Sequence, residues 1–125
     1  MVTKIADSEL EVMRVLWQEG RPLSFSEIRT ALEGKTDWKK STIQTLLGRL
    51  RDKGVLRTQE HYVTLYSPNV SEAEYVKAEG QHFIDKLFDG NAMKLVTALC
   101  QSGQLDEDDV DELKAFFIVD ELENA

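Results

Sequence analysis

A helical pattern of apolar residues organises the stretch from residue 38 to residue 56. Its apolar positions recur at i, i+3, i+4 and i+7, and they are Ile43, Leu46, Leu47 and Leu50. This spacing is typical of an amphipathic helix that buries one stripe. Gly54 follows at a position where helices often end in a left-handed residue. We therefore predict a helix over about residues 39–53, with Asp37 or a neighbour as its N-cap.

Two earlier helices are predicted from capping boxes, in which a Ser and a Glu three residues later satisfy the first N–H groups of a helix. The two pairs are Ser8 with Glu11 and Ser24 with Glu27. We predict a first helix over about residues 7–18, a short strand at Leu23 and a second helix that ends at Gly34.

The apolar period changes from 3.6 to 2 after Gly54, which predicts two short strands. They span about residues 55–60 and 62–67, with a tight turn near His61. The hairpin is followed by three more predicted helices. The first covers about residues 72–88, with Ser71 and Glu74 as a third capping box and Gly90 at its end. The second covers about residues 93–100. The third begins at Asp106 as N-cap, with Asp109 at N3, and ends at about residue 122.

This order predicts a mainly α fold with a small β-hairpin. Three helices and a hairpin form a winged helix-turn-helix, which we assign to residues 1–70 as a DNA-binding domain. Residues 71–125 form a predicted helical dimerisation domain. The large apolar residues of its helices exceed what one small cluster can cover, and such surfaces usually associate, most often as two-fold dimers. The predicted interface residues are Tyr75, Phe83, Leu87, Leu95, Leu99, Leu113, Phe116 and Phe117.

The formal charge of −8 is unevenly distributed along the 125 residues. Residues 1–70 hold eleven Lys and Arg against nine Asp and Glu, a net charge of +2, whereas residues 71–125 have a net charge of −10. Six basic residues and one acidic residue lie between Lys39 and Arg57. This asymmetry favours an interface with a polyanion in the first half.

The third helix is therefore the predicted DNA contact. In a major groove, hydroxyl and amide side chains reach base edges while Lys and Arg meet phosphates. The residues that we predict to contact DNA are Lys39, Lys40, Ser41, Thr42, Gln44, Thr45, Arg49, Arg57 and His61. The alternative is a winged-helix module for protein–protein contact, which has no need of this basic stretch.

The sequence shows no pattern typical of an enzyme. The single cysteine, Cys100, excludes an internal disulfide and a cysteine metal cage. Neither His61 nor His82 stands near a nucleophile or a metal cluster, and there is no glycine-rich phosphate loop. We expect no catalysis, no cofactor and no metal. The N-terminus has no apolar signal region and no apolar run approaches a membrane span, so we expect a cytoplasmic protein without membrane contact.

Four segments together resemble the BlaI/MecI/CopY penicillinase-repressor family. They are LEVMRVLW (residues 10–17), STIQTLLGRLRDKGVL (41–56), HFIDKLFDGNAMKLV (82–96) and LDEDDVDELK (105–114). The resemblance covers nearly the whole chain. It implies a homodimeric transcriptional repressor that binds a dyad-symmetric operator through the helix near residues 39–53.

The resemblance also shows where this chain departs from the family. Thr42, Thr45 and Arg49 match the family's reading helix, whereas Gln44 stands where the β-lactamase repressors carry arginine. Ser41 and Lys40 replace a lysine and a proline, so a different operator sequence is expected.

The two induction routes of the family also differ here. The Cys-x-Cys motifs of the copper-responsive members are absent, and the dipeptide at the family's protease site is Ala98–Leu99 rather than Asn–Phe. An inactivating protease or another inducer remains an open partner.

Overall fold

The structure is a computed structural model that describes the backbone of residues 4–124 and the side chains of residues 4–116. The chain divides into two compact units, the first ending at Glu79 and the second beginning at Gly80. The division falls within a helix, C-terminal to the boundary predicted after residue 70. The predicted interface residue Phe117 lies outside the described side chains.

The first helix, α1 (Asp7–Glu19), confirms the predicted span but not the predicted cap. Its N-cap residue is Ala6, whose N–H donates to Glu9 Oε1 at 2.7 Å. The capping box predicted from Ser8 and Glu11 is therefore wrong. Ser8 lies inside the helix, because the buried carboxylate of Glu9 already accepts the hydrogen bond at the helix start.

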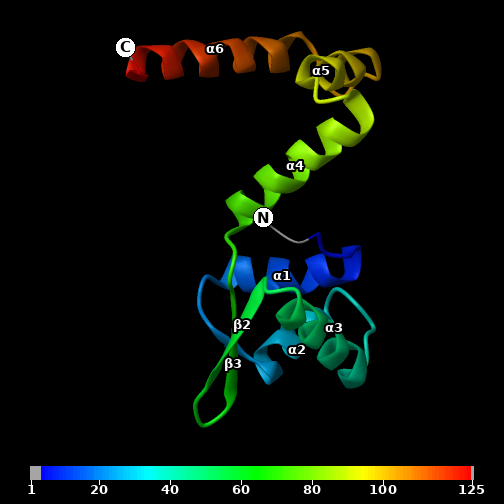
Figure 1. Cartoon of the computed structure of the whole chain (residues 1–125), viewed down its shortest axis with the longest axis vertical. Coiled ribbons are helices and arrows are strands. Elements are labelled where there is room, and N and C mark those ends of the chain that lie inside the picture. Colours follow the sequence, from blue (N-terminus) through cyan, green and yellow to red (C-terminus); the bar gives the residue numbers. More distant parts are fainter. Residues whose placement is uncertain (1–3, 125) are drawn as a thin grey trace. The chain divides into compact units, whose positions relative to one another are not determined.

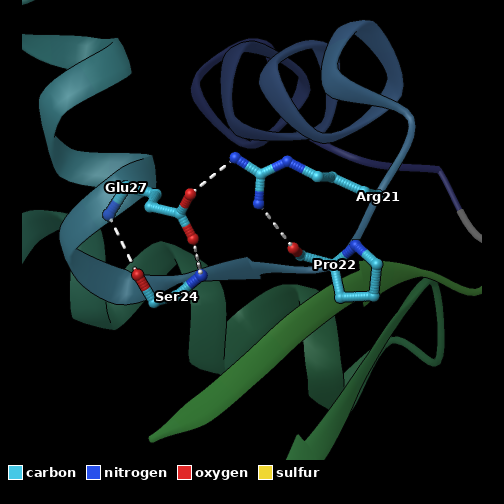
Figure 2. Close-up of polar contacts among 4 residues, drawn as sticks. All are labelled: Arg21, Pro22, Ser24 and Glu27. Atoms are coloured by element: carbon cyan, nitrogen blue, oxygen red, sulfur yellow. Dashed lines mark hydrogen bonds and ion pairs between the residues drawn. The ribbon is translucent and has the colours of Figure 1, made fainter.

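The second helix, α2 (Phe25–Glu33), begins as its sequence predicts. The N–H of Glu27 donates to Ser24 Oγ at 3.2 Å, and the N–H of Ser24 donates to Glu27 Oε1 at 3.1 Å (Figure 2). This reciprocal pair confirms the second capping box. The short strand before it, β1 (Leu23–Ser24), and the C-cap at Gly34 are confirmed as well.

The third helix, α3 (Lys40–Asp52), has Lys39 as its N-cap residue without a side-chain capping hydrogen bond. The prediction named Asp37 or a neighbour as the N-cap; the cap is not Asp37 but lies two residues beyond it, and it forms no side-chain bond. The C-terminal end follows the prediction. Gly54 has a φ of 79°, its N–H donates to Arg51 O at 3.0 Å, and the N–H of the next residue donates to Leu50 O at 3.2 Å. These bonds form a Schellman motif, which requires a left-handed residue such as glycine.

Two antiparallel strands, β2 (Leu56–Glu60) and β3 (Thr64–Pro68), follow α3. β3 begins later than predicted because residues 61–63 form the turn, in which the N–H of His61 donates to Val63 O at 3.2 Å. We call residues 56–68 the wing; in Figure 1 it extends as a green hairpin away from α1, α2 and α3. β1 pairs with the free edge of β3, which gives a three-stranded sheet in the order β1-β3-β2.

One hydrophobic core holds α1, α2, α3 and the sheet together. All four apolar positions of the stripe on α3 are buried in it, as predicted. Burial of such side chains stabilises by about 1.5–3 kcal/mol each relative to exposure. The buried apolar residues are Ile5, Val12, Met13, Val15, Leu16, Leu23, Ile28, Leu32, Ile43, Leu46, Leu47, Leu50, Val55, Leu56 and Tyr75.

The fourth helix, α4 (Glu72–Phe88), starts in the first unit. Ser71 and Glu74 exchange hydrogen bonds at 3.1 and 3.2 Å, which confirms the third capping box. The ring of Tyr75 lies 5.8 Å, centroid to centroid, from that of Trp17 on α1. Tyr75 is only 6% exposed, so the first turn of α4 is part of the core of the first unit.

The second unit contains the end of α4, α5 (Ala92–Gln101) and α6 (Glu107–Asn124). Asn91 caps α5 through its Oδ1, and reciprocal bonds between Asp106 and Asp109 confirm the predicted cap of α6. Within residues 80–116, no side chain is buried. The apolar residues of these helices are therefore left without a core of their own in the single chain.

Candidate nucleic-acid interface

The face of α3 opposite its buried stripe is polar and exposed. All predicted contact residues on and just before this helix are exposed: Lys39, Lys40, Ser41, Thr42, Gln44, Thr45 and Arg49. The buried stripe fixes this orientation, because a helix that buries one side must present the other to solvent. The amphipathic pattern thus positions the whole basic and hydroxyl-rich set on one surface.

Thr45 has a specific hydrogen-bonding state on this surface. Its Oγ1 donates to the carbonyl oxygen of Ser41 at 2.9 Å. A threonine hydroxyl has only one proton to donate, so Thr45 offers an external ligand an acceptor and a methyl group. Within the part of the chain that the structure describes, the Gln44 side chain forms no hydrogen bond, and its amide can both donate and accept, as bidentate contact with adenine requires.

A groove of about 460 Å³ separates the start of α3 from the wing. It brings together residues from α2, α3 and β3 that are far apart in the sequence. Lys40 stands at its edge, with its Nζ 6.0 Å from the centroid of the Phe25 ring. The groove is lined by Phe25, Ser26, Lys40, Gln44, Val63, Thr64 and Tyr66. Only Lys40 and Gln44 of these were predicted, since the others reach the groove through long-range packing.

The tip of the wing is exposed. His61 lies there, as predicted, beside Tyr62, whose side chain is fully exposed. Glu60, just before the turn, accepts hydrogen bonds from Thr64 Oγ1 at 3.1 and 3.2 Å.

Arg57 is not part of the groove beside α3. Its Nε donates to Ser67 Oγ at 3.2 Å across the base of the wing. It lines a second pocket, of about 440 Å³, that also includes Trp17, Arg21 and Ser71. The structure therefore separates Arg57 from the other predicted contact residues. Successive residues of a strand point to opposite faces, and Arg57 lies at the base of the wing, several residues from its tip.

Lys53, one of the six basic residues between Lys39 and Arg57, pairs with a buried carboxylate. Its Nζ lies 2.5 Å from Glu9 Oε1, and the Glu9 side chain is 1% exposed. Burial by itself would raise the pKa of Glu9, but the hydrogen bonds from Lys53 and Ala6 and the nearby charges of Lys53 and Arg49 hold that pKa below its ordinary value. The carboxylate is thus ionised and paired, and the charge of Lys53 is directed into the protein.

The start of α2, which borders the groove, is stabilised by an exposed ion pair. Figure 2 shows Arg21 between Glu27 and the backbone of Pro22; its Nη2 lies 2.6 Å from Glu27 Oε2. The Arg21 hydrogen bond, with the N–H of Ser24, lowers the pKa of Glu27 to about 2. Glu27 therefore stays ionised over the whole neutral range and keeps the N-terminus of α2 capped.

The predicted dimer surface needs one correction. Tyr75 packs into the core of its own chain, against Trp17, and does not belong to an exposed interface. Leu95 and Leu99 are half-buried on α5. Phe83, Leu87, Leu113 and Phe116 are exposed, with exposed fractions from 41 to 66%.

The fold and the basic, hydroxyl-rich face of α3 define a DNA-binding protein of the winged-helix class. The penicillinase repressor family model matches residues 5–117. The chain therefore belongs to the penicillinase repressor family. Within the described residues, no helix has both the length and the apolar character to span a bilayer.

The individual relatives cover between 60 and 98% of this chain. The penicillinase repressor of Bacillus licheniformis is 32% identical over 98% of this chain and 94% of its own length. The methicillin resistance regulatory protein MecI of Staphylococcus aureus is 29% identical over 89% and 90%. A solution structure of the Bacillus licheniformis BlaI monomeric form in complex with the blaP half-operator is 38% identical, with a TM-score of 0.53, over 60% of this chain and 92% of that one.

Proposed function

We propose that this chain is a homodimeric transcriptional repressor that binds a dyad-symmetric DNA operator through α3. The proposal concerns binding rather than catalysis. The observation that carries it is the exposed face of α3, which presents Lys39, Lys40 and Arg49 around Thr42 and Gln44. Cations beside short hydrogen-bonding groups suit a major groove, where the cations meet phosphates and the polar groups meet base edges.

The groove beside α3 supports the same arrangement. A duplex that receives α3 in its major groove must pass one sugar-phosphate strand between this helix and the wing. The groove offers that strand the ammonium of Lys40 and the hydroxyl of Ser26. His61 then meets the flanking backbone from the wing tip, as predicted. Arg57, at the base of the wing and bonded to Ser67, is left out of the proposed contact set.

The dimer proposal is supported by the uncovered apolar side chains of residues 80–116. Phe83 is 47% exposed, Leu87 58% and Met93 66%. Exposed apolar surface of this kind marks an association site, and a second copy of the chain gives the two-fold arrangement that is commonest among oligomers. Phe83, Leu87, Leu95, Leu99, Leu113 and Phe116 form the proposed interface. The domain assignment follows: residues 1–70 bind DNA and residues 71–125 dimerise, with Tyr75 anchoring the second to the first.

Two solved structures of BlaI support the DNA partner. BlaI was solved with a half-operator and as a DNA-binding domain, at 38 and 37% identity to this chain. A half-operator is what one protomer of a dimer would occupy. An operator-binding protein must also meet chromosomal DNA, so we place its action in the cytoplasm.

Selection of duplexes from a random-sequence pool by the full-length chain tests this proposal. The enriched sequences should contain an inverted repeat, because a two-fold dimer presents two identical reading helices. The half-site centres should be about one helical turn, roughly 10 base pairs, or a multiple of it apart. Enrichment of no sequence, or of a single unrepeated site, would contradict the proposal. A variant with Gln44→Ala is the matched control, since it keeps the charges of α3 and should enrich its pool less.

A further inference from the structure

The ion pair between Glu9 and Lys53 joins two segments that are far apart in the sequence. Glu9 lies in the first turn of α1, and Lys53 is the C-cap residue of α3. Lys53 Nζ and Ala6 N both donate to the same oxygen, Glu9 Oε1, at 2.5 and 2.7 Å. The Glu9 side chain is 1% exposed, and its Oε2 is buried without a hydrogen-bond partner among the described residues.

An ion pair of this kind often adds little net stability to the fold. Glu9 is removed from water, whereas the Lys53 side chain is 32% exposed. Removing a carboxylate from water carries a desolvation penalty that its attraction to a partner often fails to offset, and an apolar pair of similar shape is frequently as stable or more stable. The half-satisfied carboxylate of Glu9 makes that balance less favourable still. A hydrogen-bonded ion pair fixes the relative orientation of two segments better than apolar contact does, because a hydrogen bond constrains distance and angle together.

The direction that matters here is the axis of α3. The apolar stripe of Ile43, Leu46 and Leu50 holds the helix against the core, but apolar contacts allow small rotations and tilts. Gln44 lies nine residues from Lys53, about 13 Å along the helix, so a tilt of roughly 5° at the C-terminus moves it by about 1 Å. Hydrogen bonds to base edges tolerate little displacement of that size.

On this basis we propose that Glu9 is a positioning residue for DNA reading: it holds Lys53 and thereby fixes the angle at which α3 is presented to the base pairs. The inference rests on the proposed function of α3. It also assigns Lys53 a different role from its neighbours in the basic stretch. Lys40 and Arg49 face solvent and meet phosphates, whereas the charge of Lys53 is used inside the protein.

The decisive variant replaces both charged residues by methionine in the full-length chain, Glu9→Met with Lys53→Met. This change removes the directional hydrogen bond between the two residues but fills a similar volume with apolar atoms, so the chain is expected to fold. The dissociation constant is measured for the duplex that the wild type enriches and for a random duplex of equal length, each over a range of salt concentrations. Thermal unfolding followed by circular dichroism confirms that each variant is folded at the assay temperature.

The expected result is a loss of specificity without a loss of general affinity. Affinity for the enriched duplex should fall about tenfold, the size of one lost base-edge contact. Affinity for the random duplex should change by less than twofold, and the dependence on salt should match the wild type. Glu9→Gln is a milder second variant, which keeps the shape of Glu9 and an acceptor for Ala6. It should lower the ratio of affinity for the enriched duplex to affinity for the random duplex, as the methionine pair does.

Three outcomes would overturn the positioning role. If a folded methionine pair, or Glu9→Gln, binds both duplexes as the wild type does, the ion pair is structural only. If the salt dependence of the methionine pair becomes shallower, Lys53 contacts phosphate and not Glu9 in the complex. If the wild type prefers no sequence, the proposed function fails together with this inference; normal specificity in the wild type separates the two failures.

Discussion

Trp17 donates its indole N–H to the carbonyl oxygen of Val70 at 3.0 Å, across 53 positions of sequence. This bond ties α1 to the segment that leads into α4. The Trp17 ring also packs on Tyr75, which is the first buried side chain of α4. The entry to α4 is thus anchored to the core of the DNA-binding unit by one hydrogen bond and one aromatic contact.

Replacing Trp17 with Phe should separate these two contributions. Phenylalanine keeps an aromatic ring against Tyr75 but leaves the Val70 carbonyl without its donor. The free energy of unfolding should fall by about 1 kcal/mol, the usual net worth of one such bond. Urea denaturation followed by circular dichroism measures the change. An unchanged midpoint would show that water replaces the indole at Val70 without loss.

The pKa of Glu27 should depend directly on Arg21. With a folded pKa of about 2, below the ordinary 4.5, this pairing contributes stability that is fully present above about pH 4.5. That contribution is lost as the pH falls through about 2. In Arg21→Ala the pKa of Glu27 should rise toward 4.5 but stay below it, since the N–H of Ser24 still donates to the carboxylate. Carbon-13 NMR titration of the Glu27 carboxyl in both proteins decides this, and identical midpoints would contradict the pairing in solution.

Gln44 should contribute to specificity rather than to general affinity. Gln44→Ala should weaken binding to the enriched duplex by about 1–3 kcal/mol, because a bidentate contact with a base is lost. Binding to a random duplex should weaken less. Fluorescence anisotropy with both duplexes provides the comparison, and Ser26→Ala, a hydroxyl on the other side of the groove, is a matched control for backbone contact. Equal losses on the two duplexes would make Gln44 a backbone contact or a surface residue.

Dimerisation should depend on residues beyond Glu79. The full-length chain is expected to sediment as a dimer at micromolar concentration, because the apolar side chains of residues 80–116 need cover. A fragment of residues 1–79 keeps Tyr75 in its core and should be a folded monomer. It should bind the enriched duplex far more weakly, since two linked reading helices gain affinity from effective concentration. A monomeric full-length chain, or a fragment that dimerises as tightly, would refute the assignment.

Local patterns predicted much of this fold. The stripe of Ile43, Leu46, Leu47 and Leu50 identified α3 because helical periodicity and burial coincide there. The capping boxes at Ser24 and Ser71 were confirmed because both hydrogen bonds form within one turn. The family resemblance added the overall class of the protein, which the penicillinase repressor family model now shows.

The errors share a long-range cause. Glu9 and Glu11 both stand in the first turns of α1, and Glu9 is the one engaged at the helix start because Lys53, 44 positions away, fixes its carboxylate. The sequence pattern predicted Tyr75 to be an exposed interface residue, because its contact with Trp17 joins positions that are far apart in the sequence. The groove beside α3 combines residues of three elements, so no local pattern could have indicated Phe25 or Tyr66 as part of it.

The salt dependence of DNA binding by the full-length chain tests the central claim most directly. If Lys39, Lys40 and Arg49 of two protomers each contact a phosphate, as proposed, there are about six such contacts, so the log–log slope of the association constant against salt should be about −5, at roughly 0.9 per contact. Lys40→Ala should make the slope shallower by about 2, one contact for each protomer, on both the enriched and the random duplex. A slope near zero on either duplex would contradict the account, because a reading helix surrounded by cations cannot bind DNA without displacing counterions.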